Sequence, residues 1–371
     1  MKKVRFSDVF DDITKKAVKI PTNEYLSNGL YQIIDQGQSD IAGYSNNQTG
    51  LYTDVPVIVF GDHTRILKYI DKPLFLGADG VKLLKVKDRN FNCKYLFYAL
   101  CNARIPDTGY NRHFKWLKEV KIPIPSIDEQ QKIASILDKV SDLIALRKQQ
   151  LAKLDELVKS RFVEMFGDLI NHQCQWEMCQ LKEVCKSTDD IKCGPFGTQL
   201  GKEEYRKEGI AVWEIPQINS SFMSPPTDFV SEEKAKQLSA YSIIPGDIAM
   251  SRKGNVGKCA IFPEQYASGI IHSDVLRIRV NKQKVVSKFM MYQLRISKAV
   301  EAQIAIVSSG AIMAGINVTK LKNINVHIPP MELQKQFTCF IDKIDSLNSD
   351  IEKSLEELNI LKKSLMQEYF A

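Results

Sequence analysis

The chain has 371 residues, of which 44% are hydrophobic and 26% are charged, and its formal net charge is +7. This composition is typical of a globular protein with room for two or three domains. No run of 18 apolar residues exists, and no apolar segment follows the two lysines at the start. We therefore expect no membrane span and no secretory signal, and we place the chain in the cytoplasm.

Residues 1–122 alternate short strand-like runs with turns. The runs "GLYQIID", "VPVIVFG" and "GVKLLKVK" are rich in Val, Ile, Leu and Tyr, and Gly, Asn and Asp separate them. The later stretch "NCKYLFYALCN" has helical periodicity. This pattern predicts an α/β (α+β) domain with small twisted β-sheets.

Residues 123–167 read as one long helix, which begins after the extended segment "IPIPS" and ends near Gly167. Residues 168–328 then repeat the strand-and-turn rhythm of the first domain. Residues 329–371 repeat the long helix, again after a proline-containing entry, "HIPP". The sequence thus predicts two globular domains, each followed by a helix.

The repeat can be aligned without a gap. Residues 117–166 match residues 321–370 at a constant offset of 204, and 15 of the 50 aligned positions are identical. An internal repeat of this kind indicates duplication of a structural unit.

Each long helix carries an apolar stripe at heptad spacing. A helix of about 37 residues would be about 55 Å long and could not bury such a stripe by itself. We predict that the two stripes form a coiled-coil seam; the alternative is that each helix folds onto its own domain. The spacing leaves parallel and antiparallel packing open. The predicted seam residues are Ile133, Val140, Leu154, Phe337, Ile344, Ile351, Leu358 and Leu365.

The positive charge lies outside these helices. Residues 126–166 have no net charge and residues 330–371 have a net charge of −3, which leaves +10 on the remainder of the chain. An excess of this kind on the globular parts is suggestive of a phosphate-binding surface.

The polar loops of both domains are the candidates for reading DNA. Arg and Lys pair with guanine edges or phosphates, and Asn and Gln pair with adenine, so their mixture suits the major groove. In the first domain the candidates are Tyr44, Asn46, Asn47, Gln48, His63, Arg65, Lys68, Asn111, Arg112, His113 and Lys115, with Tyr110 in the same loop as the last four. In the second domain they are Lys192, Thr198, Gln199, Lys202, Arg252, Lys253, Asn255 and Lys258.

Three motifs are weak signals for other chemistry. Cys174, Cys179, Cys185 and Cys193, with His172, lack the spacing of a zinc knuckle. The stretch "GNVGKC" lacks the first glycine and the final hydroxyl of a phosphate-binding loop. Asp107 with Glu119 and Lys121 has a nuclease-like spacing, but the second repeat does not preserve it. We predict no catalytic residue and no metal site.

Several longer motifs together resemble those of the specificity subunits of type I restriction–modification systems. They are "IPIPSIDEQQKIASILD" with its second copy "IPPMELQKQFTCFIDKID", "IKCGPFGTQLGKEEYRKEGIAV" and "IPGDIAMSRKGNVGKCAIF". The likeness covers essentially the whole chain, although Leu333 replaces the glutamate that precedes the glutamine in the first copy.

The resemblance implies that the two helices pack antiparallel and that each globular domain reads one half of a bipartite, asymmetric site in double-stranded DNA. It implies docking of two methyltransferase subunits, and restriction or translocase subunits as further partners. S-adenosylmethionine, Mg and ATP would be bound by those partners, with no cofactor in this chain. The length of the helices would set the gap between the half-sites.

Three alternatives remain open. The partner could be a fused methyltransferase–nuclease, the chain could itself be a DNA-modifying enzyme, or it could be a coiled-coil adaptor that binds only protein. DNA affinity that falls steeply with salt would exclude the last, since neutralising phosphates releases counterions.

Overall fold

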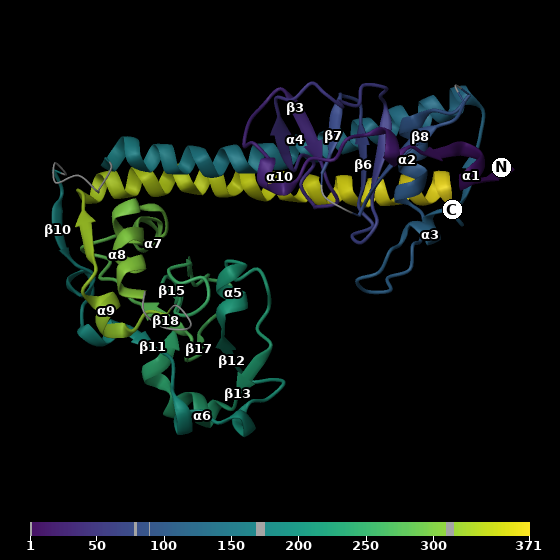
Figure 1. Ribbon diagram of the computed structural model, residues 1–371. Helices are drawn as coiled ribbons and strands as arrows, with labels where there is room; N and C mark the ends of the chain where they lie inside the picture. Colours follow the sequence, from purple (N-terminus) through teal and green to yellow (C-terminus); the bar gives the residue numbers. More distant parts are fainter. Residues whose placement is uncertain (1, 78–79, 89, 168–174, 309–314) are drawn as a thin grey trace. The chain divides into compact units, whose positions relative to one another are not determined.

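The computed structural model describes residues 2–77, 80–88, 90–167, 175–308 and 315–371. The chain divides into two compact units, which are Met1–Gln150 with Asp350–Ala371, and Leu151–Ser349. Each unit contains one globular domain and one end of each long helix (Figure 1). In the part of the chain that the structure describes, no helix is long and apolar enough to cross a membrane.

The first unit is built from two small sheets and a two-stranded ribbon. One sheet has the order β2-β8-β5-β6, the other has the order β4-β3-β7 with β3 and β7 parallel, and β1 pairs antiparallel with β9 in the ribbon. The strands are β1 (Lys2–Arg5), β2 (Phe10–Asp12), β3 (Tyr31–Ile34), β4 (Gly43–Ser45), β5 (Val57–Gly61), β6 (Leu67–Ile70), β7 (Leu74–Leu76), β8 (Val81–Val86) and β9 (Lys121–Ile124). The helices of this domain are α1 (Phe6–Val9), α2 (Cys93–Cys101) and α3 (Phe114–Leu117).

The second unit follows the same plan. Its sheets have the orders β11-β18-β15-β16 and β13-β12-β17-β14, β12 and β17 are parallel, and β10 pairs with β19. The strands are β10 (Glu177–Gln180), β11 (Ile191–Cys193), β12 (Ile210–Trp213), β13 (Asp228–Val230), β14 (Ser242–Ile243), β15 (Ile248–Ser251), β16 (Cys259–Ile261), β17 (Gly269–Ile271), β18 (Val275–Ile278) and β19 (Asn325–Ile328). The helices are α5 (Ile215–Asn219), α6 (Glu232–Gln237), α7 (Ser287–Ile296), α8 (Lys298–Ser308) and α9 (Val318–Lys322).

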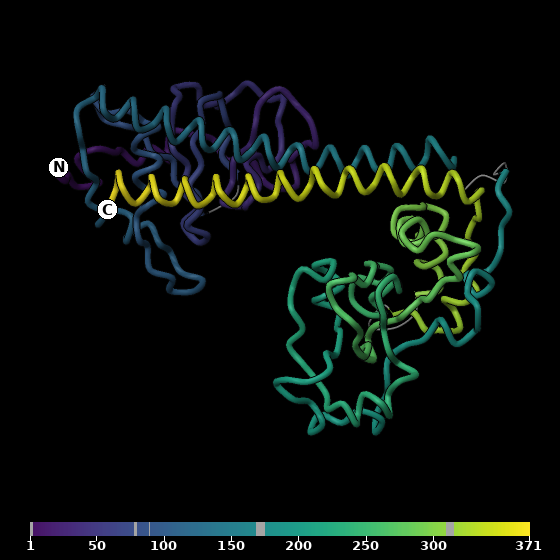
Figure 2. The backbone as a smooth tube through the Cα atoms, turned by 180° about the vertical axis from the view of Figure 1, so that it is seen from behind, coloured from purple at the N-terminus to yellow at the C-terminus, as the bar shows by residue number. Residues whose placement is uncertain are grey.

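The two long helices are α4 (Ile127–Phe166) and α10 (Met331–Phe370), each of 40 residues. In the first unit, Ile133 and Leu137 near the start of α4 share a core with Phe370 at the end of α10. In the second unit, Phe162 near the end of α4 shares a core with Phe337 near the start of α10. The helices therefore pack antiparallel within each unit (Figures 1 and 2).

The apolar stripes are buried most completely where a globular domain also covers them. Of the predicted seam residues, Ile133, Val140, Phe337 and Ile344 are buried, whereas Leu154, Ile351, Leu358 and Leu365 are half-buried. The predicted pairing of the stripes is confirmed, but each helix end also packs on a domain. The two alternatives weighed from the sequence, pairing with the other helix and folding onto a domain, thus coexist at the helix ends.

A buried glutamine attaches each domain to its long helix. In the first unit, the Oε1 atom of Gln130 accepts a hydrogen bond from the Asn92 amide at 2.9 Å, at the N-cap of α2. In the second unit, the Oε1 atom of Gln334 accepts one from the Val286 amide at 2.9 Å, at the N-cap of α7. The two glutamines are equivalent in the repeat, and both are almost completely buried. This contact explains why the second copy keeps the glutamine although the preceding glutamate is replaced.

A second attachment is also repeated. The ammonium group of Lys94 on α2 lies 3.3 Å from Asp138 on α4, and that of Lys288 on α7 lies 2.7 Å from Asp342 on α10. Asp138 and Asp342 are 204 positions apart, the offset of the repeat. The duplicated segments therefore carry the same contacts to the globular domains.

We predict that Gln334→Ala lowers the free energy of unfolding of the second unit by about 1–3 kcal/mol, because the Val286 amide loses its acceptor in a buried place. The exposed Gln336→Ala on the same helix is the matched control, with a change within about 0.5 kcal/mol. Hydrogen exchange along α7 and chemical denaturation would measure both. Equal protection of α7 in the two variants would contradict the prediction.

Candidate nucleic-acid interface

The first unit brings together two of the three polar loops predicted from the sequence. The hairpin loop between β5 and β6, residues 62–66, contacts the segment between α2 and α3, residues 102–113. The rings of His63 and Tyr110 are stacked, with centroids 4.6 Å apart and planes 8° apart. The Nη2 atom of Arg65 donates to the Oδ2 atom of Asp107 at 2.7 Å. The segment between α2 and α3 projects from the body of its unit (Figures 1 and 2).

Charge and backbone geometry hold this pair of loops in place. The Gly109 amide and the Arg65 guanidinium lower the pKa of the Asp107 carboxyl, so its ion pair with Arg65 persists to a lower pH than an isolated carboxylate would allow. Arg65 has a φ of 64°, in the left-handed region that non-glycine residues rarely adopt. Arg65 thus combines an uncommon backbone conformation with a side chain that is held by Asp107.

Two of the predicted DNA-reading residues of the first unit are buried. The Nζ atom of Lys68 donates to the Ser39 carbonyl at 2.5 Å and lies 3.7 Å from Asp35, and burial lowers the pKa of this ammonium. The ring of His113 is completely buried, with Nδ1 3.0 Å from the Asp62 carbonyl oxygen. Both side chains hold loops together, and neither is exposed to a ligand in this structure.

The remaining predicted loop of the first unit forms a turn of its own. Asn46 accepts a hydrogen bond from the Leu30 amide, and Asn47 accepts one from the Thr49 amide, so their side-chain oxygens are engaged locally. Tyr44 is half-buried and Gln48 is exposed. In the projecting segment, Asn111 and Arg112 are exposed, and Lys115 is exposed on α3.

The second unit also brings its two predicted loops together. The guanidinium carbon of Arg252 lies 4.8 Å from the ring centroid of Phe196. Arg252 is held in place by the Ile316 and Ser273 carbonyls, which accept from its Nε and Nη1 atoms. Sequence reasoning missed Phe196, although the glycine that follows it was a signal of an exposed turn.

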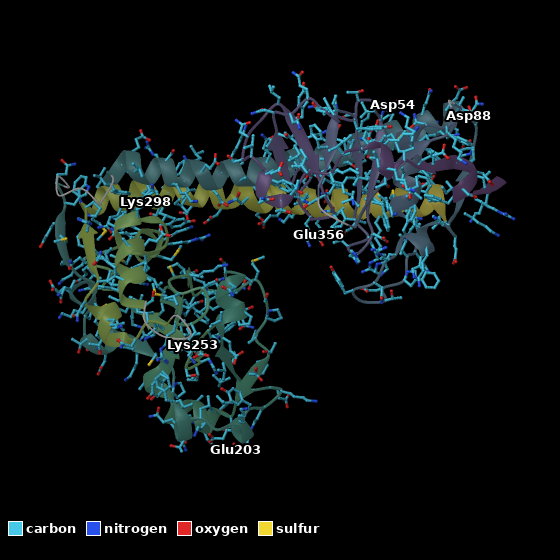
Figure 3. The ribbon with its side chains drawn as sticks, viewed as in Figure 1. Asp54, Asp88, Glu203, Lys253, Lys298 and Glu356 are labelled. Carbon is cyan, nitrogen blue, oxygen red and sulfur yellow. The ribbon has the colours of Figure 1, made fainter. Side chains whose placement is uncertain are left out.

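The other predicted residues of the second unit lie around this contact. Lys192 lies over the ring of Tyr241, whose hydroxyl donates to the Oε1 atom of Gln199 at 3.0 Å. Lys253 forms an ion pair with Asp274 at 2.8 Å, and Figure 3 marks its place in the second unit. Thr198, Lys202 and Asn255 are exposed, and Lys258 is half-buried.

The same hairpin organises both candidate sites. The loop between β15 and β16 occupies the topological place of the loop between β5 and β6. Asp62 in the first loop accepts a backbone hydrogen bond from His113 at 2.8 Å, and Arg252 in the second accepts one from Ile316 at 3.1 Å. The backbone contact is shared, whereas the side chains differ.

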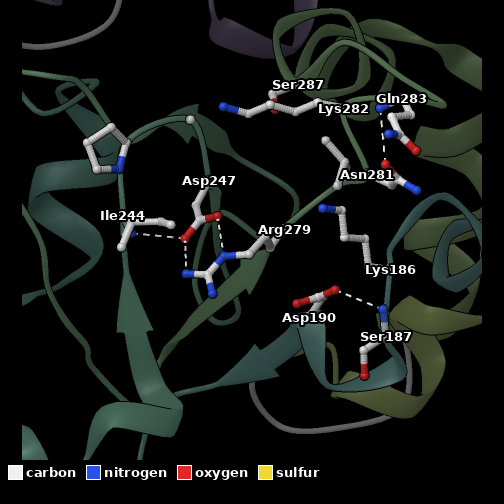
Figure 4. A pocket seen from close by; sticks show the side chains of 13 residues that line it. Lys186, Ser187, Asp190, Ile244, Asp247, Arg279, Asn281, Lys282, Gln283 and Ser287 are labelled. Carbon is white, nitrogen blue, oxygen red and sulfur yellow. Dashed lines mark hydrogen bonds and ion pairs between the residues drawn. The ribbon is translucent and has the colours of Figure 1, made fainter.

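A cavity of about 390 Å³ lies elsewhere in the second unit (Figure 4). Arg279 binds Asp247 there through two hydrogen bonds of 2.8 and 2.7 Å, and Asp190 accepts from the Ser187 amide. Lys186 and Lys282 complete its charged lining. Because Asp247 neutralises Arg279, these two residues form a structural ion pair in the cavity wall.

Two of the weak motifs can be located in part in the structure. The stretch "GNVGKC" leads into the strand β16, whereas a phosphate-binding loop leads into a helix. Among the described residues, no three His, Cys, Asp or Glu side chains are grouped to hold a metal, and Cys174 and His172 lie outside the described residues. Burial raises the pKa of the Cys185 and Cys259 thiols to about 12, so neither is a thiolate at neutral pH.

Comparison with known families identifies this architecture. The family described as "Type I restriction modification DNA specificity domain" matches residues 1–156 and 174–360. The chain belongs to this family. Two consecutive matches agree with the duplicated DNA specificity domain seen in the structure.

Individual relatives carry consistent names. The chain is 24% identical over 322 residues to the type I restriction enzyme MjaVIII specificity subunit of Methanocaldococcus jannaschii, covering 79% of this chain and 74% of that protein. It is 23% identical over 368 residues to the EcoR124I/EcoR124II specificity subunit of Escherichia coli, covering 93% and 86%. A protein assigned as the MjaX specificity subunit of M. jannaschii is 29% identical over 202 residues, and the match spans only 45% of its length.

Solved structures show the same fold. The S subunit of a type I restriction–modification system from M. genitalium has a TM-score of 0.59 at 17% identity, over 100% of this chain and 96% of that one. A chain from a study of complex assembly in the type I R-M system has a TM-score of 0.57 at 15% identity, over 100% and 97%. The family assignment confirms the resemblance and the prediction of a DNA-recognition subunit rather than an enzyme, and it does not favour the alternatives.

We predict that Arg112→Ala weakens DNA binding and lowers the dependence of log Kd on log salt by about one, because one phosphate contact is lost. Its stability should change by less than about 0.5 kcal/mol, since the side chain is exposed. Salt titrations of DNA binding and thermal unfolding would measure the two effects.

Lys68→Met should lower stability and leave the salt dependence of DNA binding unchanged, the reverse of Arg112→Ala. The Ser39 carbonyl and Asp35 lose their buried partner, so we expect about 1–3 kcal/mol of destabilisation, with an unchanged salt dependence of DNA binding. A reduced salt dependence in this variant at full stability would show that Lys68 does reach the DNA.

Proposed function

We propose that this DNA specificity protein is the subunit of a type I restriction–modification system that reads a bipartite, asymmetric site in double-stranded DNA, one half with each unit. The observation that carries the proposal is the repeated architecture with different loops. The two units share the order of the sheet that carries the hairpin and the hairpin contact, while His63 and Arg65 stand in one hairpin and Arg252 and Lys253 in the other. A duplicated scaffold with unlike loops suits an asymmetric site.

We further propose that two methyltransferase subunits dock on the helical pair, and that restriction or translocase subunits join them. S-adenosylmethionine, Mg and ATP would be bound by these partners, which transfer a methyl group to the N6 atom of adenine, and this chain would bind no cofactor. The assembly would act on DNA in the cytoplasm.

The surface of the helical pair supports this docking. In the first unit, Leu143 and Leu146 of α4 and Leu361 of α10 are between 43% and 48% exposed. In the second unit, Leu157 of α4 and Leu347 of α10 are 47% and 50% exposed. Leucines that stay this exposed on both helices leave apolar surface available for contact with another protein.

The test is to sequence the methylated DNA of cells that express this chain with its methyltransferase subunits. We expect N6-methyladenine in a single motif of two unlike half-sites, separated by a fixed number of unread base pairs. Exchanging residues 1–121 for the corresponding segment of a relative should change one half-site and keep the other. A continuous motif, or identical half-sites, would contradict the proposal.

The length of the helices should determine the gap between the half-sites. Inserting one heptad after Gln150 in α4 and one after Ser349 in α10 lengthens each helix by about 10.5 Å, which is about three base pairs of B-DNA. We expect the methylated motif to gain about that many unread positions while both half-sites stay the same. A motif with an unchanged gap and retained methylation would overturn this relation.

A further inference from the structure

In the first unit, the exposed ring of Tyr110 is stacked on the ring of His63. Tyr110 is 87% exposed, yet one face of its ring is covered by the parallel ring of His63. Here the opposite face of a flat π system is left open to a ligand.

Contacts within the projecting segment hold this ring before any partner binds. The Gly109 amide donates to the Oδ1 atom of Asp107 at 3.1 Å, and Asp107 is paired with Arg65. The hydroxyl of Thr108 lies 3.3 Å from the Nε2 atom of the buried His113. Gly109 has a φ of 74°, which only glycine adopts easily. Because the segment is ordered in advance, a ligand on Tyr110 would meet a low entropic cost.

The second unit contains an independent version of the same arrangement. Phe196 is 47% exposed, and the guanidinium of Arg252 covers one face of its ring. Arg252 is itself fixed by two backbone carbonyls. Phe196 and Tyr110 come from different parts of their domains, but the covering residue comes in both cases from the equivalent hairpin, β5–β6 or β15–β16. In each unit, a different segment has thus placed an aromatic ring against a side chain of the equivalent hairpin.

The charges around the rings indicate what would cover them. Arg104, Arg112 and Lys115 are exposed on or beside the segment that holds Tyr110. Lys202 and Lys253 are exposed in the two loops that meet at Phe196, and the ammonium group of Lys253 is paired with Asp274 at 2.8 Å. Open aromatic faces among cationic side chains are typical of surfaces that stack nucleobases and neutralise phosphates.

We propose that Tyr110 and Phe196 are base-stacking residues, and that each receives the face of a base that has left the regular stack of the duplex. This inference rests on the proposed function and deepens it by naming the state of DNA that each unit recognises. Methylation of adenine requires the base to be extruded, which costs a few kcal/mol of stacking and pairing. A ring that stacks on an unstacked base offsets part of that cost at the recognition site.

The test compares the full chain, assembled with its methyltransferase subunits, on duplexes that carry the motif found by methylation sequencing. We expect Tyr110→Ala to weaken binding to the matched duplex about tenfold or more, whereas Tyr110→Phe retains the ring and should bind like the wild type. A series of duplexes should then carry one mismatched base pair at each position of the contacted half-site in turn. At one of these positions the mismatch should restore most of the affinity lost in Tyr110→Ala, because the mismatched base is already unstacked. Phe196→Ala, with Phe196→Tyr as its control, should be restored by a mismatch in the other half-site.

Other outcomes have distinct meanings. Equal affinity of Tyr110→Ala and the wild type overturns the proposal, and so does a loss that no mismatch restores, which would mark a groove contact or a structural role. If Tyr110→Ala fails to fold, Tyr110→Leu keeps an apolar side chain without the π face, and the same mismatch comparison decides. A wild-type assembly that binds and methylates no DNA would contradict the proposed function itself rather than the role of these rings.

Discussion

The antiparallel packing of α4 against α10 is the interaction on which the rest of this structure depends. On an isolated 40-residue helix an apolar stripe at heptad spacing would stay exposed to water, so each helix requires the other. The packing also completes the domain cores. Phe370, from the second repeat, contacts Tyr95 in the first unit with ring centroids 5.2 Å apart. Phe166, from the first repeat, contacts Phe289 in the second unit at 4.9 Å. Each domain core therefore includes a phenylalanine ring from the long helix of the other repeat.

The contacts that attach each domain to its long helix are the same in both units, whereas the side chains of the hairpins differ. The glutamine at each helix start and the Lys–Asp pair beside it are shared, because each domain has to be attached to its helix in the same way. The place of the hairpin in the sheet and one backbone hydrogen bond to it are shared as well. The side chains of the two hairpins are unlike, and they are among the groups that could distinguish one DNA sequence from another.

The sequence was sufficient to predict the repeat, both long helices and their apolar seam, because a periodic signal over five heptads outweighs local propensity. It could not choose between parallel and antiparallel packing, since heptad spacing is the same in both. It also placed Lys68 and His113 among exposed readers, because a polar residue in a polar loop gives no sign that neighbouring loops will bury it. Phe196 was missed for the converse reason, as aromatic residues more often belong to the core.

The exchange of phenylalanines between repeats has a consequence for how the chain is made. Tyr95 is synthesised early, yet the ring that covers it belongs to the far end of the second repeat. This core therefore lacks one of its aromatic rings until the second repeat has been synthesised. During synthesis the apolar stripe of α4 is exposed until α10 has been made. A chaperone or a partner subunit would have to cover this stripe to prevent aggregation.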